Sequence, residues 1–208
     1  MSSPIEALTL EVADTTAAHR FYTALGLDTR VGLRSSDAPT TGFRGFSLSL
    51  TMSQPADVRG FVDAALDAGA TSLKPAAKSF WGYGGVVRAP DGTIWKIATS
   101  AKKDTAPATG RIDRMVLLLG TASVTASKRF YVEHGLAVAK SFGSKYVEFD
   151  TQDSPVSLAL YGRRALAKDV GVPVDGTGSH RIALVGGTGA FTDPDGFGWE
   201  AASLTPAP

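Results

Sequence analysis

One stretch near the start of the chain, RFYTALGL at residues 20–27, returns as RFYVEHGL at residues 129–136. A second stretch, PDGTIWK at residues 90–96, returns as PDGFGWE at residues 194–200. Both motifs recur in the same order and at similar spacing, which indicates an internal duplication. The chain is therefore expected to contain two copies of one structural unit.

The duplication suggests where the domains begin and end. A chain of 208 residues is long enough for two domains of about 100 residues each. We expect a first domain at residues 1–100 and a second, shortened domain at residues 111–208. Residues 101–110, rich in Lys, Ala, Thr and Pro, are expected to form the linker.

Each copy opens with a strand and a helix. The alternation of apolar residues over 5–12 predicts a strand, and Asp14 or Thr15 is expected to cap a helix that ends at Gly26. The second copy repeats this pattern with a strand over 112–119 and a helix over 123–134. Each copy closes with a Pro-Asp-Gly turn between two strands.

The middles of the two copies differ. In the first, residues 46–52 predict a strand and residues 55–68 an amphipathic helix. The second has no long helix at the corresponding place. Its predicted elements are strands at 137–142, 145–149, 156–161 and 180–185 and a short basic helix at 163–170.

Composition excludes several classes of function. The formal net charge of +1 and the lack of a clustered basic stripe argue against nucleic-acid binding. The chain contains no cysteine, which excludes disulfides, thiol catalysis and thiolate metal sites. No signal peptide and no apolar run of membrane-spanning length is visible, so we expect a cytoplasmic protein without a membrane partner.

The duplicated motifs resemble those of the vicinal oxygen chelate superfamily, which includes glyoxalase I, extradiol dioxygenases and bleomycin-binding proteins. Its common marks are RFY…LG after a first strand and DPDG…WE at a last strand, and the second copy carries both, the latter at residues 193–200. The resemblance implies an α+β fold of tandem βαβββ modules, whose curled mixed sheets form clefts. Tandem modules can pair within one chain, so both a monomer and a homodimer fit.

Enzymes of this superfamily hold a metal with two histidines and a glutamate. At the corresponding places the first copy has Ala7, Ser47 and Lys96. An alanine offers no ligand, a serine is a poor one, and a protonated lysine repels a cation. The resemblance therefore implies no metal in the first copy.

In the second copy the same places fall on Arg114, on Arg181 or its neighbour His180, and on Glu200. Only Glu200 matches the family's ligand, so we predict no metal cofactor here either. We expect an Arg114–Glu200 ion pair to replace the charge of the metal.

The segment around Trp81 offers another kind of site. Three aromatic rings, Phe80, Trp81 and Tyr83, are followed by glycines, which suits the stacking of a flat ligand, although packing of the rings into the core is an equal alternative. Glu11 and Lys96 are expected to face the same cleft. The predicted ligand-binding residues are Phe80, Trp81, Tyr83, Glu11, Ser47, Trp95, Arg114 and Arg181.

Two functions of different class follow. The first is a metal-independent protein that binds and sequesters a small aromatic or amphipathic molecule, as antibiotic-binding members of the superfamily do. The second is a divergent lyase or isomerase in which Glu200, Lys96 or His180 serves as acid or base. The lack of metal ligands favours the first, and the sequence does not identify the ligand.

Overall fold

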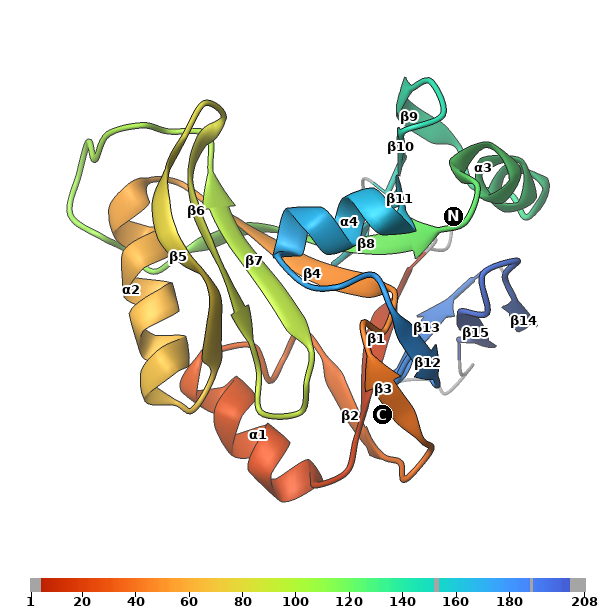
Figure 1. Ribbon diagram of the computed structural model, residues 1–208, viewed down its shortest axis with the longest axis horizontal. Coiled ribbons are helices and arrows are strands. Elements are labelled where there is room, and N and C mark those ends of the chain that lie inside the picture. The colour runs from red at the N-terminus through yellow and green to blue at the C-terminus, as the bar shows by residue number, and fades with distance from the viewer. Residues whose placement is uncertain (1–4, 152–153, 188, 203–208) are drawn as a thin grey trace, which may run out of the picture.

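The computed structural model describes residues 5–151, 154–187 and 189–202. Two mixed sheets and four helices, α1 (Thr15–Ala24), α2 (Pro55–Asp67), α3 (Val124–Glu133) and α4 (Arg163–Val170), make up most of this part of the chain (Figure 1). The predicted α+β class is confirmed.

The larger sheet has eight strands in the order β5-β6-β7-β4-β8-β11-β10-β9. Its halves are two βαβββ units of equal topology, joined where β4 and β8 pair in antiparallel. In each unit the first and last strands pair in parallel, β4 with β7 and β8 with β11. The strands are β4 (Phe46–Met52), β5 (Thr71–Ser79), β6 (Gly82–Arg88), β7 (Ile94–Thr99), β8 (Ile112–Thr121), β9 (Val138–Phe142), β10 (Tyr146–Phe149) and β11 (Ser157–Gly162).

The smaller sheet has five strands in the order β14-β15-β13-β1-β2. It joins the beginning of the chain to its end, because β1 pairs in antiparallel with β13. Its strands are β1 (Ala7–Val12), β2 (Gly32–Ser35), β13 (Ile182–Gly186), β14 (Phe191–Thr192) and β15 (Gly198–Ala201), and a separate ribbon pairs β3 (Thr40–Gly42) with β12 (Gly176–Gly178). Both sheets thus mix strands from the two halves of the sequence, an interleaving that the motif repeats did not reveal.

Local signals placed most elements correctly. Asp14 caps α1 by accepting from the N–H of Ala17, and Ser123 caps α3 in the same way through Ala126. The strand β5 was not predicted, since its sequence TSLKPAAKS lacks apolar alternation. It is an exposed edge strand, where lysine and proline guard against pairing with another chain.

The main core joins the two sheets through α1, α2 and α3. It contains fully buried side chains such as Leu10 of β1, Leu48 of β4, Leu117 of β8 and Leu184 of β13. These residues alternate with partly exposed ones along their strands, so each sheet turns one face to this core.

The other face of the larger sheet is partly covered by α4, which lies across β4 and β8 in Figure 1. Leu166, Ala167 and Val170 of α4 form a second apolar cluster with Val86 of β6 and Ile94 of β7. We call this the α4 face. Helix α4 therefore covers the middle of this face, where it packs against β8, β11 and β4, and it leaves the edge strand β9 exposed.

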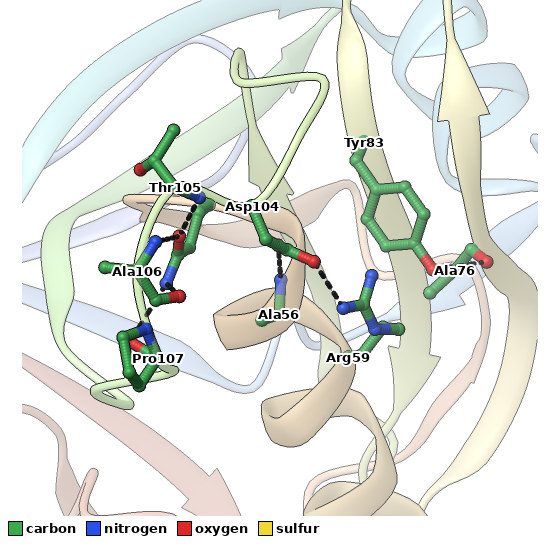
Figure 2. Close-up of polar contacts among 9 residues, drawn as sticks. Ala56, Arg59, Ala76, Tyr83, Asp104, Thr105, Ala106 and Pro107 are labelled. Carbon is green, nitrogen blue, oxygen red and sulfur yellow. Dashed lines mark hydrogen bonds and ion pairs between the residues drawn. The ribbon is translucent and has the colours of Figure 1, made fainter.

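The segment between β7 and β8 is fixed to α2 by hydrogen bonds, as Figure 2 shows for residues 104–107. Asp104 accepts from the N–H of Ala56 and pairs with Arg59 at 2.7 Å. The buried Gln54 and Asp57 bind the backbone of residues 105–110. This segment has no regular secondary structure, but it is held in place against α2.

Candidate functional site

A cleft of about 490 Å³ opens on the α4 face beside helix α4. Both units of the sheet and the helix contribute to it. Its lining residues are Ser49, Lys96, Leu118, Lys140, Phe142, Tyr146, Glu148, Tyr161 and Asp169. We refer to this set as the cleft.

Strand register explains why these side chains gather. In the β8–β11 unit, Leu118 lies opposite Ala159, which lies opposite Glu148, and Glu148 lies opposite Lys140. The next row toward the end of the sheet carries Tyr161, Tyr146 and Phe142. Since side chains alternate along a strand, the two rows point to the same face.

The second of these rows forms an aromatic wall. The ring centroids of Tyr146 and Tyr161 lie 6.1 Å apart, and those of Phe142 and Tyr146 lie 6.0 Å apart. Phe142 is 66% exposed although it is large and apolar. Such exposure on an edge strand of a cleft leaves apolar surface for a ligand to cover.

An ion pair lines the cleft on the side next to α4. Lys96 Nζ donates to both carboxylate oxygens of Asp169 on α4, at 2.7 and 2.9 Å. Lys96 was expected in a cleft, and the structure places it there. Its partner on the helix was not predicted, because no sequence rule brings α4 onto β7.

A second ion pair, beside Glu148 of the cleft, belongs to a set of polar contacts that spans three strands. Arg114 of β8 donates to Ser157 of β11 at 2.8 Å and to Glu148 of β10 at 2.6 Å. Burial alone raises the pKa of Glu148, but the hydrogen bond and charge of Arg114 outweigh it, so the pKa lies below its ordinary value. Burial, and then the charge of Glu148, raise the pKa of Tyr146, which keeps this phenol neutral.

Lys140 is the cation of the cleft that remains available. Among the described residues, no carboxylate oxygen lies within 4.0 Å of its Nζ, whereas Lys96 and Arg114 are both paired. An acidic ligand in the cleft would meet this ammonium group first.

The expected Arg114–Glu200 pair does not form. Glu200 lies on β15 of the smaller sheet, and it binds Arg34 of β2 at 2.8 Å. Arg34 also binds Glu11 of β1 at 2.7 Å, so one guanidinium joins two carboxylates. An arginine does pair with Glu200, but it is Arg34, because Arg34 and Glu200 both lie in the smaller sheet whereas Arg114 lies in the larger one.

Glu11 and Lys96 do not share a cleft, contrary to the prediction. Glu11 belongs to the smaller sheet and Lys96 to the larger one. The prediction assumed that each half of the chain forms its own sheet, and the interleaving of the two halves separates these side chains.

His180 is held by backbone groups. Its Nδ1 lies 2.5 Å from the carbonyl oxygen of Arg44, and its Nε2 lies 3.0 Å from that of Asp195. The ring also stacks on Phe197 at 3.9 Å. Neither nitrogen is directed at the cleft, so His180 has a structural position. Its neighbour Arg181 is buried beside α1, in another cavity.

The predicted aromatic segment lies away from the cleft. Phe80 and Trp81 sit at the tip of the β5–β6 hairpin and are 79% and 82% exposed. Tyr83 faces the opposite side of the sheet from Lys96, where its hydroxyl donates to Ala76 and Arg59 lies over its ring (Figure 2). None of these three rings lines the cleft, and only Tyr83 packs partly against the main core.

Trp95 and Ser47 are both buried. Trp95 packs in the main core, where its ring centroid lies 5.9 Å from that of Tyr22. Trp199 packs in the same way, with its ring centroid 5.8 Å from that of Tyr131. Ser47 lies on the α4 face without exposed surface, and its hydroxyl has no partner among the described residues. Trp95 therefore contributes to stability, and Ser47 lies beneath the covering helix.

The side chains that form the aromatic wall and its cation were missed by sequence reasoning. The signal was available, since the strands at 137–142, 145–149 and 156–161 were predicted. Alternation within them puts Lys140 with Phe142, Tyr146 with Glu148, and Ala159 with Tyr161. What could not be read was that the three strands turn these faces to one cleft.

The donor set of the cleft does not fit a divalent metal. It has two carboxylates, and each is paired with a cation, Glu148 with Arg114 and Asp169 with Lys96. In the described part of the chain, no group of three or more His, Asp or Glu side chains could hold a metal ion. Ammonium and guanidinium groups supply no lone pair for coordination.

Structural comparison confirms the fold that the motifs suggested. Glyoxalase I from Zea mays matches with a TM-score of 0.62 at 15% identity, over 96% of this chain and 92% of that one. A Bacillus subtilis protein assigned as a dioxygenase matches with a TM-score of 0.54 at 13% identity, over 93% of this chain and 72% of that one. The chain thus has the fold of glyoxalase I, as the duplicated motifs predicted.

Sequence comparison adds no closer relative. No family model matches the chain, and no curated protein matches it either. Within the described residues, no helix has both the length and the apolar character needed to cross a bilayer.

Proposed function

We propose that this protein binds a small, negatively charged aromatic or amphipathic molecule in the cleft without the help of a metal. The observation that carries the proposal is the row of Phe142, Tyr146 and Tyr161 beside the unpaired ammonium group of Lys140. An aromatic wall binds a flat apolar ring, and the neighbouring cation selects an acidic group.

The rest of the cleft supports binding of an acid. The carboxylates of Glu148 and Asp169 are neutralised by Arg114 and Lys96, so they repel an acidic ligand less than free carboxylates would. The cleft volume of about 490 Å³ falls within the usual range for sites of small molecules. A phenolic or carboxylic ring compound therefore suits both its shape and its charge.

Metal independence is part of the proposal. It rests on the paired carboxylates and on the two lysines that line the cleft. A cation placed there would face Lys96 and Lys140 and would have to displace two ion pairs.

Calorimetric titration with benzoate, after dialysis against EDTA, tests the proposal. We expect saturable binding of benzoate, weaker binding of benzyl alcohol, and no change when Zn²⁺ or Mn²⁺ is added. Lys140→Gln and Phe142→Ser should each weaken binding about fivefold to tenfold. Both side chains lie on an exposed edge strand, so these substitutions should leave the fold intact.

Trp81→Ser is the matched control, because it removes an exposed aromatic ring outside the cleft. It should leave the affinity for benzoate unchanged. Absence of saturable binding, or binding that requires added metal, would contradict the proposal.

Catalysis by the cleft is a second candidate, because Lys96 and Asp169 line it together. An ion-paired lysine beside a bound acid is able to transfer a proton in a lyase or isomerase reaction. Glu200 and His180 lie elsewhere, so of the three predicted acid–base residues only Lys96 fits this role. If a bound ligand is converted, Lys96→Met should abolish turnover while leaving the binding of that ligand measurable.

A further inference from the structure

A second cavity lies beside the N-terminus of α1, apart from the cleft. Its volume is about 200 Å³, and Ala13, Ala17 and Ala18 line it on the side of the helix. Arg44 and Arg181 also line the cavity. The cavity therefore combines two guanidinium groups with the positive end of a helix dipole.

The two arginines have donors that are left without partners. Arg181 is only 9% exposed, and its Nε is buried with no acceptor among the described residues. Nη1 of Arg44 is in the same condition, although Nη2 of this residue donates to the carbonyl oxygen of Asp91 at 2.6 Å. A buried donor without an acceptor is unfavourable, and a bound anion would supply the missing acceptor.

The surroundings of Arg44 also disfavour the charged form of its guanidinium group. Burial lowers the pKa of Arg44, the charge of Asp91 opposes this effect, and the neighbouring Arg181 adds to it. An anion between the two guanidinium groups would compensate both.

Three carboxylates line the same cavity, and each already has donors of its own. Glu11 is bound by Arg34, and Asp14 accepts from the N–H of Ala17 as the helix cap. Asp91 accepts from the hydroxyl of Tyr22 at 2.9 Å and from the backbone and side chain of Thr93. Within the described residues, none of these carboxylates accepts a hydrogen bond from Nη1 of Arg44 or Nε of Arg181.

In the second copy of the repeat, a carboxylate occupies the position equivalent to this cavity. There, Asp195 of the Pro-Asp-Gly turn puts its carboxylate against the N-terminus of α3. It accepts from the N–H of Ala122 and from the hydroxyl of Ser127, both at 2.7 Å.

The motif repeats align these residues with the first copy. Ala122 corresponds to Ala13 and Ser127 to Ala18, and both of the latter line the cavity. The equivalent of Asp195 is Asp91, which turns to Tyr22 instead. The first copy thus keeps space and donors at a position that a carboxylate occupies in the second.

From this comparison we infer that the cavity beside α1 is a binding site for a small organic carboxylate, held by Arg44, Arg181 and the N-terminus of α1. The site is separate from the cleft and is independent of the proposed function. Its size admits an acid of only a few atoms beyond the carboxylate group.

Acetate is the probe for this site. Saturable changes in the Nε–H resonances of Arg44 and Arg181 are expected on titration with acetate, measured by NMR against chloride at equal ionic strength. The melting temperature should rise in parallel, because a ligand that binds only the native state stabilises it.

Arg181→Asn should weaken acetate binding about tenfold or more, since it removes a charged hydrogen-bond donor. Asparagine tolerates the left-handed backbone of this residue, whose φ is 57°. Arg20→Gln, on the exposed side of α1, is the matched control and should leave binding unchanged.

Ala18→Asp provides a test that keeps both arginines. Its carboxylate should fill the cavity from within and abolish the response of both arginines to acetate. An unchanged response in this variant would overturn the inference, and so would the absence of saturable shifts in the wild type. Preferential binding of inorganic phosphate over acetate would overturn the assignment to carboxylates.

Discussion

The two βαβββ units of the larger sheet have the same topology but different faces. Helix α4 covers Val86 and Ile94 of the β4–β7 unit with an apolar cluster built around Leu166, and its Asp169 pairs with Lys96. Helix α4 also packs against β8 and β11, but toward the edge strand β9 the same face stays open and carries Phe142, Tyr146 and Tyr161. The comparison shows that one short helix can bury side chains on this face of one unit while part of the same face in the other unit stays open to solvent.

The largest effect is expected from Leu166→Ala in helix α4. Leu166 is fully buried, so removal of its side chain should lower the free energy of unfolding by about 2–4 kcal/mol. Urea denaturation followed by circular dichroism measures the change. A loss below about 0.5 kcal/mol would mean that Leu166 does not hold α4 on the sheet.

Arg114→Met tests the polar support of the β8–β11 unit. It leaves the mostly buried carboxylate of Glu148 without its cation, and the free energy of unfolding should fall by about 1–3 kcal/mol at neutral pH.

The difference between wild type and Arg114→Met should also depend on pH. Because the folded-state pKa of Glu148 is lowered, the stability it contributes is present above its ordinary value of 4.5 and is lost as the pH falls through the folded pKa. Unfolding curves at pH 7 and pH 3 should therefore converge for the two proteins at the lower pH. A difference that stays constant would rule out the charge of Glu148 as the cause.

A double-mutant cycle on Lys96 and Asp169 measures the coupling energy of the ion pair between β7 and α4. Both side chains are about one-third exposed, so we expect a coupling energy of only about 0.5–1 kcal/mol between Lys96→Met and Asp169→Asn. High salt should reduce this value further. A coupling near zero would show that this ion pair does not help to hold α4 on the sheet.

The smallest effect is expected at the exposed aromatic residues. Trp81→Ser and Phe142→Ser should each change the free energy of unfolding by less than about 0.5 kcal/mol, since both rings are mostly exposed. A large loss for Phe142→Ser would place its ring in the core and remove it from the ligand surface.

The sequence revealed the local structure and the duplication, but not the pairing of the copies. Alternation and capping located β1, α1, α3 and α4, because those signals depend on neighbouring residues. The antiparallel pairing of β4 with β8, and of β1 with β13, depends on contacts between distant parts of the chain. No local pattern encodes such contacts.

Little of the candidate site was predicted from the sequence, since Lys96 alone among the predicted site residues lines the cleft. The absence of metal ligands at Ala7, Lys96 and Arg114 followed directly from residue chemistry. The segment around Trp81 attracted attention because its aromatic residues are close in sequence. The aromatic wall instead comes from three separate strands, where one ring per strand carries no obvious local signal.

Intermolecular nuclear Overhauser effects with bound benzoate show where a small aromatic acid lies on the protein. We expect contacts from the benzoate ring to Phe142 and Tyr161 of the aromatic wall, and none to Phe80 or Trp81. Contacts confined to Phe80 and Trp81, or none to the protein at saturating benzoate, would contradict the proposed function.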